Sequence, residues 1–329
     1  MIKINLSSNQ KDELEKIFLM DIYDDYECND NHHPNRGEIL KSLGTEENRQ
    51  FLQTQFRSLY DYFYDDAGNI KKDKVKSLLL ADREKMEEFI EIFGSCDDKK
   101  LSNKLLYKIF RYYNFSKRKT AYNICHKLGV TVCPYCNRSY IMTLEKKCVR
   151  PQFDHYFPKS IYPYLALSLY NLIPSCSICN MAKSNMDTHK TPILYPYEEE
   201  FGEEAVFAVD VNDNDQFVQY MRGNSSEFQV TIKSTDHVLK DQIKFQNDTL
   251  HITELYNEHK DYITDIFKNY HINTPKRMEE LLKNFPELFS TEEEIRSLLF
   301  MNDIRHDNWG KRPLAKLTHD IYIELRSIT

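Results

Sequence analysis

The sequence predicts an α+β fold in which a compact strand–strand–helix unit lies between two helical flanks. Three observations lead to this prediction. Apolar residues recur every three or four positions over residues 9–115, and again from about residue 240 to the end. From Val130 onward, extended apolar runs replace this helical spacing. Two Cys-x-x-Cys pairs, at 133–136 and 176–179, frame the extended runs.

The N-terminal flank is expected to be a series of helices. Helical spacing of apolar residues is found in the segments 11–23, 49–64 and 75–93. The polar stretches 65–69 and 94–100 are expected to break the chain between helices. Residues 116–129 predict one more helix, with Gly129 as its stop.

The chain after the second cysteine pair changes character twice. Short apolar runs separated by turn residues predict a small β insertion near 205–235. Helical spacing then returns to the end of the chain. We therefore expect three regions: a helical region at 1–120, a middle region at 121–200 and a C-terminal region at 201–329.

Two helix starts in the C-terminal region can be assigned from capping residues. Thr274 followed by Pro275 fits a cap and the first position of a helix. Ser290 and Glu293 have the three-residue spacing of a capping box.

Basic residues are concentrated in the middle of an acidic chain. The whole chain carries a net charge of −7. Residues 100–190 hold 15 Lys and Arg against 3 acids, a formal charge of +12, which leaves −19 for the remainder. Such a segment indicates a surface for phosphate groups, and hence a nucleic-acid partner. Solvated basic helix faces would give the same count.

Several functional classes are disfavoured by composition. The chain has 8 glycines and neither a P-loop nor a Gly-rich dinucleotide motif, so any use of ATP is expected to come from a partner. No apolar run approaches the length that spans a bilayer. The first ten residues lack the apolar core of a signal peptide, and we therefore expect a cytoplasmic protein.

The two cysteine pairs predict a structural zinc site. Cys133, Cys136, Cys176 and Cys179 supply four thiolates, the tetrahedral donor set that leaves no open coordination position. Such a site would hold together two segments 40 residues apart. The alternative is four buried free thiols.

The remaining cysteines lack a partner at ligand spacing. Cys28, Cys96, Cys125 and Cys148 are therefore expected to be buried thiols, although Cys148 lies between the two pairs and is an alternative ligand. A second metal site at His32-His33 is a further alternative to a plain surface loop.

The segment between the cysteine pairs carries an ordered set of polar motifs. Asp154-His155 is followed by Pro158-Lys159-Ser160, then Asn171-Leu172-Ile173-Pro174, then Cys176, Cys179, Asn180 and Lys183. This set resembles the HNH endonuclease family in its zinc-bracketed form. The resemblance covers about 55 residues and implies a ββα-metal nuclease core.

The resemblance also implies a role for each residue. His155 is expected to be the general base, because an imidazole titrates near cellular pH and can take a proton from water. Asp154 and Asn180 are expected to hold a catalytic Mg²⁺ or Mn²⁺, which suits oxygen ligands. Asn171 is expected to hold the loop that carries His155. Lys159 and Lys183 are candidate phosphate contacts, or else ordinary solvated lysines.

The passage 162–176, YPYLALSLYNLIPSC, looks most like HNH subunits of bacterial anti-phage systems, of the Septu type and its retron-linked relatives. This resemblance implies an ABC-like ATPase partner and a nucleic-acid substrate, with DNA favoured over RNA. The alternative from another class is a catalytically silent, zinc-stabilised module that binds nucleic acid without cleaving it.

Overall fold

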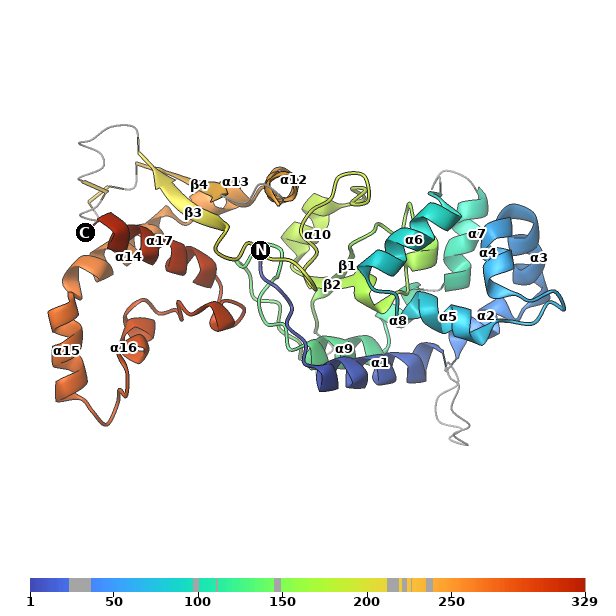
Figure 1. Cartoon of the computed structure of the whole chain (residues 1–329), viewed down its shortest axis with the longest axis horizontal. Helices are drawn as coiled ribbons and strands as arrows, with labels where there is room; N and C mark the ends of the chain where they lie inside the picture. Colours follow the sequence, from blue (N-terminus) through green and yellow to red (C-terminus); the bar gives the residue numbers. More distant parts are fainter. Residues whose placement is uncertain are drawn as a thin grey trace. The chain divides into compact units, whose positions relative to one another are not determined.

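The structure is a computed structural model that describes most of the chain (Figure 1). Contacts divide the chain into two compact units, and each is described by itself. The N-terminal unit comprises Ile4–Val130 and Met142–Pro192, and the C-terminal unit comprises Met1–Lys3, Thr131–Ile141 and Ile193–Thr329. The described residues are 1–23, 37–96, 101–110, 112–144, 149–211, 219–220, 224–225, 227–234 and 239–328.

The α+β class predicted from the sequence is confirmed. Helices dominate the described residues, and the strands there form two antiparallel sheets of two strands each. The regional boundaries near residues 120 and 200 stay predictions. Within the described residues, no helix is both long enough and apolar enough to cross a membrane.

The N-terminal unit contains ten α-helices among its described residues, in agreement with the helical region that the apolar spacing indicated. Two 3-10 helices, η2 (Pro163–Leu165) and η3 (Leu169–Asn171), lie between its strands β1 (Gln152–His155) and β2 (Leu172–Ser175). The α-helices are α1 (Ser8–Ile22), α2 (Glu38–Leu43), α3 (Glu46–Gln55), α4 (Arg57–Phe63), α5 (Lys72–Leu79), α6 (Arg83–Phe93), α7 (Leu101–Phe110), α8 (Tyr112–Ser116), α9 (Lys119–Leu128) and α10 (Ser177–Lys183).

Helical spacing in the sequence places one apolar face of α1 against α9. Leu14, Phe18 and Ile22 follow one another at four-residue intervals on α1 and are buried. On α9, Ile124 and Leu128 have the same interval and are buried too. The two helices pack along each other (Figure 1). Burial of such side chains stabilises the unit by about 1.5–3 kcal/mol each.

Two segments with continuous helical spacing are each broken into two helices. Residues 49–64 fall in α3 and α4, because Phe56 leaves helical geometry with φ −139° and ψ 65°. Residues 75–93 fall in α5 and α6. The carboxylate of Asp82 caps α6 by accepting a hydrogen bond from the Lys85 amide at 3.0 Å. Gly129 ends α9 at φ 64°, as expected.

The strand–strand–helix order of the middle segment is present as β1, β2 and α10, but its first strand differs from the expectation. Where the structure describes it, the extended run after Cys136 forms isolated bridges, Val132 with Tyr140 and Leu144 with Val149. The antiparallel pair is made instead by β1 and β2, in the register His155 opposite Leu172. The described part of this first run therefore forms turns and short bridges, although its composition favours a strand.

The C-terminal unit contains the second sheet, which confirms the β insertion expected near 205–235. Strand β3 (Ala205–Asp210) pairs antiparallel with β4 (Gln229–Ser234). Helix α17 packs against β3 (Figure 1). Among the described residues, this unit has the helices α12 (Lys240–Leu250), α13 (Ile252–Asn257), α14 (Lys260–Ile272), α15 (Pro275–Asn284), α16 (Glu292–Leu299) and α17 (Ala315–Ile328), with the 3-10 helix η4 (His306–Asn308).

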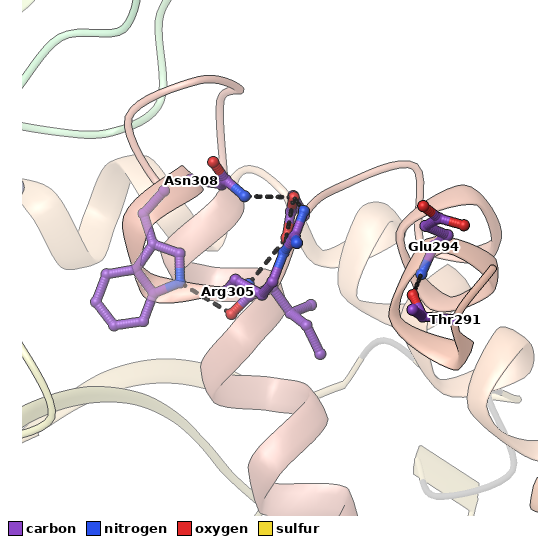
Figure 2. Close-up of polar contacts among 7 residues, drawn as sticks. Thr291, Glu294, Arg305 and Asn308 are labelled. Carbon is purple, nitrogen blue, oxygen red and sulfur yellow. Dashed lines mark hydrogen bonds and ion pairs between the residues drawn. The ribbon is translucent and has the colours of Figure 1, made fainter. Parts of the chain in front are cut away.

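The predicted cap of α15 is confirmed, and that of α16 is shifted by one residue. Thr274 caps α15, with Pro275 as its first residue. For α16 the cap is Thr291, whose hydroxyl accepts from the Glu294 amide at 3.3 Å (Figure 2). The expected cap, Ser290, instead donates its amide to the Glu294 carboxylate at 2.6 Å. Both alternatives satisfy the same three-residue spacing, so sequence spacing alone does not choose between them.

Candidate active site and metal centre

The candidate catalytic pair lies at the end of a strand. Asp154 and His155 are the last two residues of β1, with 3% and 5% of their surface exposed. Neighbouring residues of a strand point to opposite faces, and the two side chains accordingly have different partners. Asp154 meets Lys183 of α10, whereas the His155 ring meets Tyr112 and the carbonyl of Ala166.

The surroundings of His155 fix its protonation state and its tautomer. Burial lowers the pKa of His155 well below its usual value, and the nearby charge of Lys159 lowers it further. The ring is therefore neutral at pH 7. Its Nε2 lies 3.1 Å from the Ala166 carbonyl oxygen, which can only accept a hydrogen bond. Nε2 must then carry the proton, and Nδ1 holds the lone pair.

Tyr112 of α8 completes the immediate environment of His155. The two ring centroids are 4.3 Å apart in an edge-to-face arrangement. The ammonium of Lys159 lies 5.2 Å from the centre of the Tyr112 ring. Burial lowers the pKa of Lys159, against the opposing charge of Asp154. Half-buried Lys159 thus brings positive charge close to His155.

Asn171 makes the hydrogen bonds that a loop-holding residue needs. It is fully buried at the end of η3. Its Oδ1 accepts from the Phe157 amide at 2.7 Å, and its Nδ2 donates to the carbonyls of Phe157 and Leu165, each at 3.0 Å. These bonds join the backbone after His155 to the loop that contains Ala166. Asn171 therefore sets the position of the His155 ring and of its carbonyl partner together.

Helix α10 lies against β1 through two side-chain pairs. Asn180 donates from Nδ2 to Oε1 of Gln152 at 2.7 Å. One turn later, the Lys183 ammonium lies 3.1 Å from Oδ2 of Asp154. Gln152 and Asp154 are two residues apart and share one face of the strand, and Asn180 and Lys183 share one face of the helix. Asn180 is thereby held next to the strand position of Asp154.

The two lysines expected to contact phosphate lie in different settings. Lys159 is half-buried. The Lys183 side chain has no exposed surface and is committed to Asp154 and to the His155 carbonyl. Contact with phosphate stays a prediction for both. Another basic residue of this segment, Arg118, forms ion pairs with Asp21 and Glu38 rather than facing solvent.

The four paired cysteines form a cluster that could hold a zinc ion. Their sulfur atoms all lie within 4.8 Å of one another, and all four residues are buried. Tetrahedral zinc with bonds of about 2.3 Å places its sulfurs about 3.8 Å apart, which fits this cluster. Two backbone amides support the thiolates: Arg138 donates to Cys136 Sγ and Cys179 donates to Cys176 Sγ, each at 3.4 Å.

Of the four cysteines outside the cluster, the structure describes Cys96 and Cys125. Cys125 is a buried thiol, as expected, and burial raises its pKa to about 12. Cys96 is half-buried. Cys28, Cys148 and the His32-His33 pair lie outside the described residues.

Four features of the site were not anticipated from the sequence. Alternation along β1 and the helical spacing of α10 would have identified Gln152 and the Lys183–Asp154 pair. No local pattern marks Tyr112 or the Ala166 carbonyl, because long-range packing brings them to His155.

Comparison with known proteins gives one partial similarity. The chain is similar to the Septu protein PtuB of Bacillus thuringiensis, with 36% identity over 64 residues. This match covers 20% of the chain and 23% of that relative. No protein-family model matches the chain, and no solved structure matches it.

Proposed function

We propose that this protein is an HNH-type nuclease that hydrolyses phosphodiester bonds of nucleic acid, with His155 as the general base. The state of His155 carries the proposal. A neutral imidazole whose Nε2–H is tied to a backbone carbonyl presents a lone pair at Nδ1. A lone pair of fixed direction is what the removal of a proton from an attacking water requires.

The neighbouring residues have supporting roles in this proposal. Asn171 keeps the His155 ring in place through hydrogen bonds to the backbone of Phe157, which follows His155, and of Leu165, which precedes Ala166. Asp154 and Asn180 would hold a divalent cation, because carboxylate and amide oxygens are the donors that Mg²⁺ and Mn²⁺ prefer. When bound, the cation supplies positive charge to the phosphate and to the leaving oxygen. Lys159 would add positive charge near the phosphate.

We further propose a role in anti-phage defence, together with an ATPase subunit. The partial similarity to the Septu protein PtuB supports this role. The chain carries no phosphate-binding glycine loop of its own, so ATP hydrolysis would belong to the partner. DNA is the substrate that we propose first, with RNA as the second.

A catalytically silent binding module is the competing function. One observation favours it: the carboxylate expected to ligate the cation is already paired with the buried ammonium of Lys183. Such a module would bind nucleic acid through the basic segment and would have no cleavage activity to lose.

The deciding experiment compares histidine variants. Purified full-length protein, with and without a co-encoded ATPase, is incubated with plasmid DNA or tRNA in Mg²⁺ or Mn²⁺. We expect His155→Ala to slow cleavage on the order of 10²–10⁴-fold, because a general base acts in the transition state. Substrate affinity should persist, since phosphate contacts provide most of it.

A matched histidine controls for the substitution itself. His126→Ala removes an exposed imidazole from the last turn of α9 and should leave the cleavage rate unchanged. If His155→Ala cuts as fast as wild type at equal salt and metal, His155 is a structural histidine. If the wild-type protein binds both substrates but cuts neither under any of these conditions, the binding module is correct.

A further inference from the structure

The last residue of α10 places a positive charge where a cation site would be. The Lys183 side chain has no exposed surface. Its ammonium lies 3.3 Å from Oδ1 and 3.1 Å from Oδ2 of Asp154. It also lies 2.6 Å from the carbonyl oxygen of His155. An ammonium has three N–H donors, and these three oxygens can accept all of them.

These oxygens are also the kinds that hard divalent cations bind. Carboxylate and backbone carbonyl oxygens are standard ligands of Mg²⁺ and Mn²⁺. Asp154 is the carboxylate that the proposed function assigns to the cation, and Lys183 neutralises its charge. A cation that approaches Asp154 therefore meets an ion pair with no net charge, one half of which repels it.

The place of Lys183 at the end of its helix makes an exchange feasible. Its backbone belongs to the last turn of α10, and the helix is also attached to β1 through Asn180 and Gln152. The Lys183 side chain can leave Asp154 by rearranging this terminal turn alone, while the Asn180 contact keeps the helix on the strand. Helix ends are the parts that open at least cost.

We propose that the ammonium of Lys183 occupies the cation position of Asp154 in the resting protein, and that a divalent cation binds by displacing it. This inference rests on the proposed function and concerns the regulation of the same site. Lys183 makes cation binding weak, and the site fills at a lower cation concentration when the released ammonium has another place to go. The phosphate of a bound nucleic acid is such a place.

Binding of Mn²⁺ to the full-length protein tests the proposal without reference to cleavage. Free Mn²⁺ is followed by electron paramagnetic resonance, with the cysteine cluster loaded with zinc beforehand. We expect Lys183→Met, which keeps an unbranched side chain and removes the charge, to bind Mn²⁺ at least about tenfold more tightly than wild type. Lys190→Met makes the same change at an exposed lysine and should bind as wild type does. Asp154→Ala should lose the site.

A second measurement uses the wild-type protein, in case Lys183→Met does not fold. Lysines are acetylated and the products are mapped by mass spectrometry, with and without saturating Mn²⁺. We expect Lys183 to be protected without Mn²⁺ and to react in its presence, whereas the exposed Lys190 reacts in both.

The outcomes separate this inference from the proposed function. Suppose that Mn²⁺ binds in an Asp154-dependent way, but Lys183 stays protected at saturation or Lys183→Met binds no more tightly. The displacement is then wrong, and the catalytic cation site stands. If no variant shows Asp154-dependent Mn²⁺ binding, both the displacement and the proposed cation site are wrong, whatever the histidine variants do.

Discussion

Each of the two sheets packs against a helix that carries a fully buried lysine, and each lysine pairs with an aspartate. In the N-terminal unit, Lys183 of α10 reaches Asp154 on strand β1. In the C-terminal unit, Lys316 and Asp320 lie one turn apart on α17, with 0% and 1% of their side chains exposed. The first pair joins two elements, whereas the second belongs to one helix.

The pair on α17 is explained by the sheet that it covers. Asp320 Oδ2 accepts a hydrogen bond from the Phe207 amide at 2.8 Å, at the edge of β3 that does not pair with β4. The Lys316 ammonium lies 4.8 Å from the centre of the Trp309 ring. Both charges thus have local structural partners, and the carboxylate covers a strand edge that would otherwise be open.

The pair on α10 differs because its partners coincide with the candidate site. Lys183 binds the carbonyl of His155 as well as the carboxylate of Asp154. A buried ion pair by itself is therefore no mark of function, since the same chemistry serves a sheet edge in the other unit. What distinguishes the α10 pair is the hydrogen bond from Lys183 to the backbone carbonyl of His155, the histidine of the candidate site.

The β1–β2–α10 motif is smaller than the β3–β4–α17 motif. The largest effect that we expect is therefore the loss of structure in the smaller motif when zinc is lost. Strands β1 and β2 have four residues each and α10 has seven, against six, six and fourteen for β3, β4 and α17. Such short elements bury little surface of their own. We expect one zinc per chain, and structural zinc sites supply on the order of 10 kcal/mol of binding free energy.

Substituting one cysteine tests this dependence. Cys176 is both a cluster member and the N-cap of α10. We expect Cys176→Ser to lose zinc and to lose hydrogen-exchange protection in β1, β2 and α10 far more than in β3 and β4. Cys125→Ser changes a buried thiol outside the cluster and should keep its zinc. Freshly purified wild-type protein without zinc by elemental analysis would contradict the prediction.

A smaller effect is expected when the α17 pair is broken. Lys316→Met leaves the buried carboxylate of Asp320 without its partner, which typically costs about 3–5 kcal/mol of unfolding free energy. Urea unfolding measures this loss, and Mn²⁺ affinity should not change. Lys268→Met breaks an exposed pair with Asp265 and should cost less than about 1 kcal/mol. If Lys316→Met changed the Mn²⁺ affinity, the Lys316–Asp320 pair would also affect the cation site, and it would no longer differ from the Lys183–Asp154 pair in this respect.

The sequence predicted local features of the fold better than their exact limits. Capping residues and apolar spacing located α1, α9 and α15, because these features act within one or two turns. The capping residue of α16 was placed one position too early, at Ser290 rather than Thr291, because both share the spacing to a glutamate. The described residues after Cys136 form isolated bridges instead of the expected strand, since strands depend on a partner that local composition does not specify.

The candidate site likewise consists of residues that the sequence identifies and of partners that it does not. The motif residues Asp154, His155, Asn171 and Asn180 could be named from their order in the chain. Their partners could not, because the contacts of His155 with Tyr112 and with the Ala166 carbonyl depend on tertiary packing. From the sequence, Lys183 was a candidate phosphate contact or an ordinary solvated lysine, and only the structure reveals its burial and its pairing with Asp154.

The smallest expected effect concerns the third charge on α17. Glu324 follows Asp320 by one turn, and burial raises its pKa to about 7, against the opposing charge of Lys233. Its Oε2 is buried, and no described group donates a hydrogen bond to it. Because the pKa is about 4.5 when exposed, the folded chain binds more protons than the unfolded chain between pH 4.5 and 7. Stability should therefore fall as pH rises through this range.

Glu324→Gln isolates this contribution, because a neutral amide of the same shape has no proton to lose. We expect the variant to match wild type in urea unfolding at pH 5 and to be more stable at pH 8, on the order of 1 kcal/mol after allowing for partial exposure. Asp320, whose pKa burial raises to about 6, gives both proteins a slope of the same sign, so the difference between them reports Glu324 alone. A difference that stays constant from pH 5 to pH 8 would mean that Glu324 is charged in the folded protein throughout. The α17 face would then hold two charged carboxylates, with Lys316 paired to Asp320 and Lys233 as the opposing charge for Glu324.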